Sequence, residues 1–295
     1  MSPSVTMNTN PITYNPSPSR PTTRLPAGAT DTHCHVFGPT AVFPFAADAA
    51  FTPGDAPKET LFALHDMLGI ERCVVVQSGC HGFDNAVVAD AIAARPDRYL
   101  GIALLPPDVA DAEIVRLTGQ GFRGVRYNYM GHLAGGASPD ELRALAPRLA
   151  RHGWHLQIHL APERMEEMAP LFAEMPVPVV IDHMARVDAS LGIDQPAFTA
   201  LRRLLDKEHV WVKVSGSERI SADGPPWDDG VRFARVLVED HPDHVLWGTD
   251  FPHPNFKGDP PDDGMLVDLL PKIAPTDDHL RRLLVDNPAR LYGFA

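Results

Sequence analysis

The chain has 295 residues, 44% of them hydrophobic, which is enough apolar material for one large domain or two small ones. Lys and Arg total 26 against 38 Asp and Glu, and this acidic balance argues against nucleic acid or an anionic membrane as a partner. No apolar run reaches the roughly 18 residues of a membrane span, no secretory signal is recognisable, and three cysteines make no disulfide framework. We therefore expect a cytoplasmic protein, and the sequence leaves its oligomeric state open.

The first 26 residues are rich in Pro, Ser, Thr and Asn and contain few apolar residues. Such a composition predicts a disordered N-terminal tail, because too little apolar surface is available to offset the entropy of ordering. Residues 27–295 show no break in composition, and we expect them to form a single catalytic domain.

Short β-rich runs alternate with helical patterns from residue 29 onward. The predicted strands are 29–36, 73–79, 100–105, 122–128, 155–160, 178–184, 210–217 and 245–251. The predicted helices are 58–69, 84–95, 108–119, 139–152, 163–174, 195–208, 229–240 and 276–287, and a capping box at 138–141 marks one helix start. Eight strand–helix alternations predict an α/β fold of the (β/α)8 TIM-barrel type.

The longest irregular segments all follow predicted strands, at 37–57, 129–138, 218–228 and 252–264. In a (β/α)8 barrel the loops after the strands build the active face, so their length favours catalysis or ligand binding.

The first predicted strand carries two histidines two positions apart, His33 and His35. Side chains alternate along a strand, so both imidazoles should point to one face, with Asp31 on that face too. A histidine pair of this kind can converge on one metal ion or one substrate oxygen, or it can be a hydrogen-bonded part of the core.

Most of the predicted strands end in polar residues, which is unusual for apolar strands unless the polar groups are paired or functional. They are Gln77, Ser78, Arg126, Asn128, Gln157, His159, Asp182, His183, Lys213, Ser215, Arg219 and Asp250. Imidazole and carboxylate ligands together suit Zn²⁺ or a similar divalent ion, and we expect His33, His35, His159 and Asp250 to bind it. Asp250 would also be the general base, and His183 would orient or protonate the substrate.

Six segments resemble the amidohydrolase superfamily, and within it the group of 2-pyrone-4,6-dicarboxylate lactonases and 4-sulfomuconolactone hydrolases. They are 31–39, 124–128, 181–184, 217–219, 247–255 and 286–292. The resemblance implies a lactone hydrolase that opens a small anionic lactone in aromatic-acid catabolism. Arg126, Arg186 and Arg219 would bind the anionic groups, because guanidinium matches carboxylate and sulfonate geometry. Further substrate contacts would come from Ser78, Asn128 and His132.

The chain departs from the pyrone-dicarboxylate pattern at three positions. His159 stands where those enzymes carry a tyrosine, and Phe51 and His132 stand where they carry a tyrosine and an arginine. The histidine at 159 is typical of metal-dependent members of the superfamily. These differences favour a zinc-dependent hydrolase of a 4-sulfomuconolactone-like substrate.

Three alternatives stay open. The first is a metal-free pyrone-dicarboxylate lactonase, in which no cofactor is needed and His159 is a polar contact. The second is a metal-dependent decarboxylase with the same residues at its strand ends. The third is a non-catalytic barrel that binds an anion.

Overall fold

A computed structural model describes residues 8–131 and 136–294. Its eight strands form one parallel sheet in the order β1 to β8, which confirms the predicted (β/α)8 barrel. The strands are β1 (Thr30–Cys34), β2 (Arg72–Val76), β3 (Tyr99–Ala103), β4 (Phe122–Tyr129), β5 (His155–Leu160), β6 (Val179–Ile181), β7 (Val210–Lys213) and β8 (Val245–Leu246). Several strands are shorter than predicted because their polar carboxyl ends leave the ladder and turn into the loops.

Backbone hydrogen bonds between β1 and the segment after β8 close the barrel. The Thr32 amide donates to the Trp247 carbonyl oxygen at 2.9 Å, and the Asp250 amide donates to the His33 carbonyl oxygen at 2.7 Å. The closure therefore fixes the backbone of Asp250 directly against that of His33.

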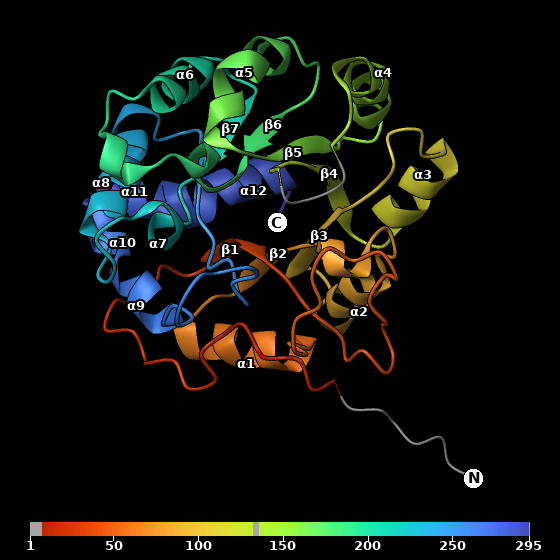
Figure 1. Cartoon of the computed structure of the whole chain (residues 1–295), viewed down its shortest axis with the longest axis horizontal. Coiled ribbons are helices and arrows are strands. Elements are labelled where there is room, and N and C mark those ends of the chain that lie inside the picture. The colour runs from red at the N-terminus through yellow and green to blue at the C-terminus, as the bar shows by residue number, and fades with distance from the viewer. Residues whose placement is uncertain (1–7, 132–135, 295) are drawn as a thin grey trace.

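Helices surround the strands as an outer ring (Figure 1). They are α1 (Lys58–Leu68), α2 (Ala86–Ala94), α3 (Asp111–Gly119), α4 (Pro139–Ala150), α5 (Met165–Ala173), α6 (Pro196–Leu204), α7 (Ser217–Ile220), α8 (Asp228–Asp240), α9 (Asp263–Asp268), α10 (Leu270–Ile273), α11 (Asp277–Arg281) and α12 (Asn287–Tyr292). The predicted capping box is present, since Ser138 Oγ accepts from the Glu141 amide at 3.3 Å. Sequence patterns missed α7, α9 and α10, which are short helices within loops, and α12, which begins where the last predicted helix ends. Among the described residues, we find no helix long and apolar enough to cross a bilayer.

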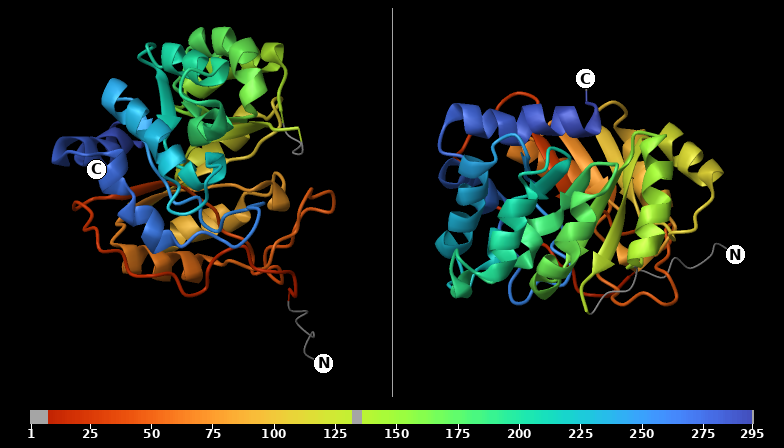
Figure 2. Two further views of the ribbon diagram at one scale, coloured as in Figure 1. Left: turned by 60° about the vertical axis from the view of Figure 1, so that its left-hand side comes forward. Right: turned by 90° about the horizontal axis from the view of Figure 1, so that it is seen from above.

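The core has two layers. Apolar side chains between the strands and the ring of helices form the larger one. A smaller cluster inside the barrel includes Val74, Ile102 and Leu246, and it extends to Tyr292 of α12. The C-terminal helices lie across this end of the barrel (Figure 2). The opposite end of the barrel, at the carboxyl ends of the strands, carries the candidate active site.

The N-terminal segment differs from the prediction of a disordered tail wherever it is described. From residue 8 to residue 26 it lies against the barrel without regular structure. Thr13 Oγ1 donates to the Pro252 carbonyl oxygen, Asp262 accepts from the Ser19 amide at 2.9 Å, and Asp268 accepts from the Thr22 amide at 2.9 Å. Side-chain carboxylates thus hold a segment that has few apolar residues of its own. Residues 1–7 lie outside the described residues.

Candidate active site

His33 of β1 and His35, just after the end of that strand, enter the barrel mouth as predicted, and both are buried. Nδ1 of His35 lies 2.7 Å from the Val76 carbonyl oxygen. A carbonyl only accepts, so Nδ1 carries the hydrogen and Nε2 presents its lone pair to the site. Asp31 does not join the pair, because the pairing of β1 with β2 shifts register after Asp31. Its carboxylate accepts from Thr249 Oγ1 at 2.6 Å instead.

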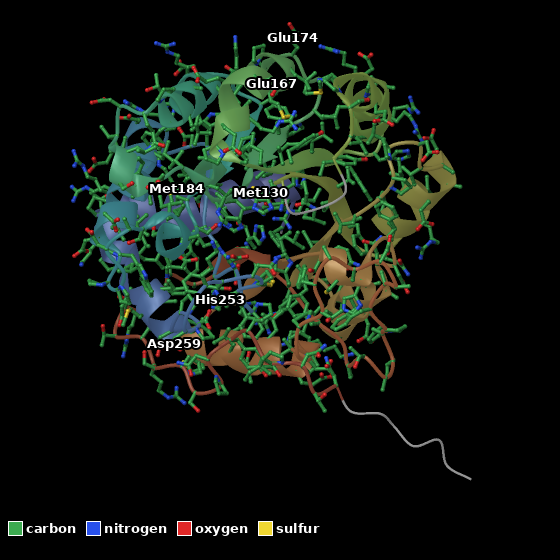
Figure 3. The ribbon with its side chains drawn as sticks, viewed as in Figure 1. Met130, Glu167, Glu174, Met184, His253 and Asp259 are labelled. Carbon is green, nitrogen blue, oxygen red and sulfur yellow. The ribbon has the colours of Figure 1, made fainter. Side chains whose placement is uncertain are left out.

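After β6 the chain makes a left-handed turn that carries two predicted site residues. His183, Met184, Ala185 and Arg186 all have positive φ, between 48° and 56°. This conformation costs roughly 1–2 kcal/mol per non-glycine residue, and such strain is concentrated at functional sites. The turn directs both His183 and Arg186 to the same cavity, and Figure 3 labels Met184 of this turn to the left of the centre of the barrel.

Asp250 is the point on which the histidines converge. Its Oδ1 lies 3.6 Å from Nε2 of His33, 3.6 Å from Nε2 of His35 and 3.7 Å from Nε2 of His183. Its Oδ2 accepts a hydrogen bond from Arg219 Nε. Burial opposes ionisation, but the Arg219 guanidinium and the imidazoles hold the pKa of Asp250 well below its usual range. The carboxylate is therefore ionised and able to accept a proton or a cation.

Three of the four predicted metal ligands form a compact group. The ligand atoms of His33, His35 and Asp250 lie within 4.8 Å of one another. Nε2 of His33 is buried and has no hydrogen-bond partner. Burying an unpaired nitrogen costs free energy, and a bound cation would remove that cost. Two imidazoles, one carboxylate and an open position are a donor set that suits a catalytic divalent ion. These residues fit the expected cofactor.

His159, the fourth predicted ligand, is not part of that group. Its Nδ1 lies 3.2 Å from Asn128 Oδ1, and its ring centroid lies 5.8 Å from that of His183. Its Nε2 is buried without a partner. Burial first, and then Arg126, lowers the pKa of His159 well below the usual value, so the ring is neutral. In this structure His159 faces the cavity as a neutral polar group.

The cavity has a volume of about 1000 Å³ and takes its lining from many of the loops after the strands. Predicted site residues that line it are His35, Ser78, Arg126, Asn128, His159, His183, Arg186, Arg219 and Asp250. His132, the remaining predicted substrate contact, lies outside the described residues. Phe51, Phe83, Met130 and Phe256 give the cavity an apolar wall.

The three predicted anion-binding arginines differ in their partners. Arg126 Nε donates to Asp182 Oδ2 at 2.8 Å, and Arg219 bonds to Asp250. Arg186 has no hydrogen bond or salt bridge to any described residue. Burial and the neighbouring Arg219 lower its pKa to about 10. Arg186 is the guanidinium best placed to meet an anion from solution.

Below the site, Lys213 occupies the barrel interior with no solvent exposure. Its Nζ donates to Gln157 Oε1 at 2.8 Å, and it lies 3.2 Å from His33 Nδ1 and 3.5 Å from Asp182 Oδ1. Its carboxylate partner is therefore Asp182, whereas Asp31 accepts from Thr249. Sequence reasoning also missed Glu218, a buried carboxyl that lines the cavity. Its position in the Ser217–Arg219 segment was the available signal.

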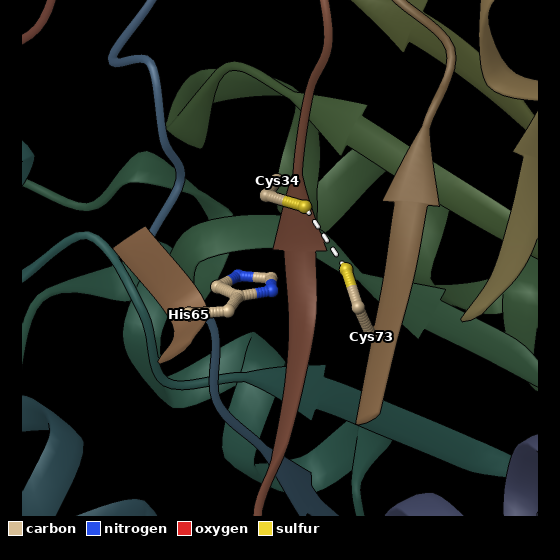
Figure 4. A group of neighbouring side chains, drawn as sticks. All are labelled: Cys34, His65 and Cys73. Carbon is tan, nitrogen blue, oxygen red and sulfur yellow. Dashed lines mark hydrogen bonds between the residues drawn. The ribbon is translucent and has the colours of Figure 1, made fainter. Parts of the chain in front are cut away.

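A second group of ligand-type side chains lies behind β1, formed by Cys34, Cys73 and His65 (Figure 4). Cys34 Sγ and Cys73 Sγ are 3.1 Å apart. Nδ1 of His65 bonds to the Tyr99 hydroxyl at 2.6 Å, and its Nε2 lies 3.2 Å from Asp31 Oδ2. Both ring nitrogens are therefore engaged, and the group packs α1 against β1 rather than offering an open site.

The fold and the converging site place the chain in a known class. The family model described as Amidohydrolase matches residues 30–294, and the chain belongs to this family. It is 46% identical over 285 residues to a 2-pyrone-4,6-dicarboxylate hydrolase of Comamonas testosteroni, with 94% of this chain and 93% of the relative covered. It is 43% identical over 273 residues to a 4-sulfomuconolactone hydrolase of Rhizobium radiobacter, with 91% of each covered.

A solved structure shows the same likeness. A probable 2-pyrone-4,6-dicarboxylic acid hydrolase of Acinetobacter baumannii, with citric acid bound, superposes with a TM-score of 0.80 at 28% identity. The match covers 90% of this chain and 100% of that chain.

Proposed function

We propose that this protein is a lactone hydrolase that opens a small anionic lactone. The observation that supports this most directly is the convergence of three imidazole Nε2 atoms on Asp250 Oδ1, at 3.6 to 3.7 Å. The names of the relatives, both hydrolases of anionic lactones, point the same way.

The side chains can supply the needs of ester hydrolysis. Asp250, held ionised by Arg219, takes the proton of the attacking water. His183 lies beside it, positioned by Ser215 Oγ at 3.0 Å from its Nδ1, and it hydrogen-bonds the carbonyl oxygen as charge develops there. Arg186 binds the anionic group of the substrate and orients the ring.

His33, His35 and Asp250 would hold a divalent ion, Zn²⁺ in the first instance. Such an ion supplies Lewis-acid polarisation of a carbonyl and lowers the pKa of a bound water.

Within this class we favour a sulfonated lactone similar to 4-sulfomuconolactone as the substrate. Identities of 46% and 43% to the two kinds of relative do not separate them. Phe51 and His159 are the basis for the choice, because both line the cavity and neither matches the pyrone-dicarboxylate pattern. A phenylalanine in place of a tyrosine removes one hydroxyl donor, so this wall of the cavity cannot bind a carboxylate as the pyrone-dicarboxylate pattern does.

The metal-free lactonase is a second candidate, and one observation favours it. Lys213 Nζ lies 3.2 Å from His33 Nδ1, and an ammonium group only donates. A hydrogen bond from Lys213 would leave the hydrogen of His33 on Nε2, where it could donate to Asp250 or to substrate but could not ligate an ion.

The test is hydrolysis of a panel of 4-sulfomuconolactone, muconolactone and 2-pyrone-4,6-dicarboxylate, together with metal analysis of the purified protein. We expect the sulfonated lactone to have the highest kcat/KM and turnover to fall by about a thousandfold or more in Asp250→Asn. Release of carbon dioxide without ring opening would replace the hydrolase with the decarboxylase. Tight binding of these anions without turnover would indicate an anion-binding barrel. Full activity in chelator, with no ion bound, would select the metal-free candidate.

A further inference from the structure

The N-terminal segment, residues 8–26, contacts two of the loops that form the cavity. The Gly54 amide, in the loop after β1, donates to the Pro11 carbonyl oxygen at 2.8 Å. Thr13 Oγ1 donates to the carbonyl oxygen of Pro252, in the loop after β8. Both loops contribute side chains to the described lining of the cavity, whereas the N-terminal segment contributes none. The segment therefore joins two walls of the cavity without entering it.

Two glycines show that the barrel is built to receive this segment. A Cβ added at Gly54 would lie 2.6 Å from the Asn10 carbonyl oxygen, and one at Gly264 of α9 would overlap the Ser19 carbonyl oxygen. Neither glycine has a positive φ, so the backbone conformation does not require glycine at these positions. What requires it is the close approach of the N-terminal segment, because a methyl group at either position would have to displace that segment.

The contacts with the loop after β8 fall directly beside Asp250. Pro252, which accepts the hydrogen bond from Thr13, lies two residues further along the chain. The ring of Tyr14 lies 5.1 Å from the ring of Phe251, the residue that follows Asp250. Phe251 and Pro252 are both buried, so the N-terminal segment takes the place of water as their neighbour.

The backbone of Asp250 needs support from its neighbours. Its φ is +61°, and the strand before it, β8, has only two residues. A non-glycine residue keeps such a conformation only where the surrounding structure holds it. The His33 carbonyl oxygen accepts from the Asp250 amide at 2.7 Å, which fixes one side of the residue to β1. On the other side, the Pro252 carbonyl oxygen is held by Thr13.

We propose that Thr13 and Tyr14 are positioning residues for Asp250, so that full turnover requires the docked N-terminal segment. This inference rests on the proposed lactone hydrolysis, in which Asp250 takes the proton of the attacking water. Thr13 acts through the peptide of Pro252, and Tyr14 acts through the ring of Phe251. A base must lie within hydrogen-bond reach of the proton that it takes, so a small displacement of its carboxylate slows the chemical step without weakening substrate binding.

The first test compares Thr13→Val, Thr13→Ser and the unmodified enzyme on the lactone of the panel that the unmodified enzyme opens fastest. Valine has nearly the shape of threonine but no hydroxyl, so the buried Pro252 carbonyl oxygen loses its donor. We expect Thr13→Val to lower kcat by roughly two- to tenfold, the value of one hydrogen bond between uncharged groups, and to leave KM unchanged. Thr13→Ser keeps the hydroxyl and should restore kcat.

The second contact is tested by Tyr14→Leu, which removes the ring beside Phe251 and leaves Thr13 in place. This variant should also lower kcat with KM unchanged, whereas Tyr14→Phe keeps the ring and should retain kcat. Thr22→Val is the matched control within the same segment. The Thr22 hydroxyl donates to Asp268 Oδ1 at 3.0 Å, away from the loop that carries Asp250, so both kinetic constants should be unchanged.

Amide hydrogen exchange in residues 251–256, followed by mass spectrometry, gives a measurement that does not depend on activity. Thr13→Val should exchange faster in this stretch than the unmodified protein, and Thr13→Ser and Thr22→Val should not. Unchanged kcat in both Thr13→Val and Tyr14→Leu would overturn the inference and leave the hydrolase intact. An equal loss in Thr22→Val, a change confined to KM, or a loss in Thr13→Val that Thr13→Ser does not restore would do the same. Absence of lactone opening by the unmodified enzyme would overturn the hydrolase and the inference together.

Discussion

Lys213 Nζ lies 3.2 Å from Nδ1 of His33, with both side chains fully buried inside the barrel. Asp182 Oδ1 lies 3.2 Å from the same nitrogen. A carboxylate accepts and an ammonium donates, so the two neighbours favour opposite tautomers of His33. With Nδ1 bonded to Asp182, Nε2 is free to ligate an ion; with Nδ1 bonded to Lys213, it is not. A hydrogen bond from Lys213 to His33 and a bound cation therefore require different tautomers of His33, and each disfavours the other.

Lys213→Met should raise the affinity for Zn²⁺ by about tenfold or more, since the variant removes both the competing donor and a positive charge near the ion. Asp182 keeps Arg126 and Gln157 as partners in this variant. Affinity is measured by competition with a chromophoric chelator.

Lys207→Met is the control for this measurement, because Lys207 is exposed on the outside of the barrel and its loss should leave the affinity unchanged. Weaker binding of Zn²⁺ to Lys213→Met would show that Lys213 supports the ion site rather than opposing it.

Arg126 and Arg186 should affect stability and substrate binding differently, because Arg126 forms an ion pair with Asp182 and Arg186 has no such partner among the described residues. Arg126→Met leaves the buried Asp182 without its closest cation and should lower the free energy of unfolding by about 3 kcal/mol. Arg186→Met removes a cation whose charge burial disfavours, so it should not lower stability. It should raise KM by about tenfold to a hundredfold, the effect of losing one charged hydrogen bond to substrate.

Urea unfolding and steady-state kinetics separate these two roles. Arg235→Met, on the exposed face of α8, serves as the control for both measurements. An unchanged KM in Arg186→Met would contradict the anion-binding role, and an unchanged stability in Arg126→Met would contradict the structural one.

The sequence predicted the barrel and the meeting of His33, His35 and Asp250, because strand alternation and parallel order alone bring the carboxyl ends of the strands together. It could not predict the position of Asp31, which depends on a register shift between β1 and β2. It could not show that His159 pairs with Asn128, because that choice depends on side-chain packing across β4 and β5. The N-terminal segment looked disordered for a similar reason, since its binding groups, Asp262 and Asp268, lie far along the chain.

The side chains of His253 and Asp263 predict how the stability of the protein depends on pH. They form a fully buried ion pair, with Nε2 and Oδ1 3.2 Å apart. Burial opposes the charge on His253, but Asp263 outweighs it and raises the pKa of His253 above its usual value of 6.5. A group whose pKa is higher in the folded state stabilises the fold fully below its unfolded pKa, and this contribution is lost as pH rises through the folded pKa.

The stability difference between the unmodified protein and His253→Gln should therefore be largest near pH 6 and fall, by on the order of 1–3 kcal/mol, toward pH 9. Urea unfolding at a series of pH values measures it. Other titrating groups cancel in the difference because they are common to both proteins. His152→Gln, at a half-buried histidine after α4, is the control variant. A difference for His253→Gln that grows with pH would mean that His253 is neutral in the fold and that Asp263 acts only as a hydrogen-bond acceptor.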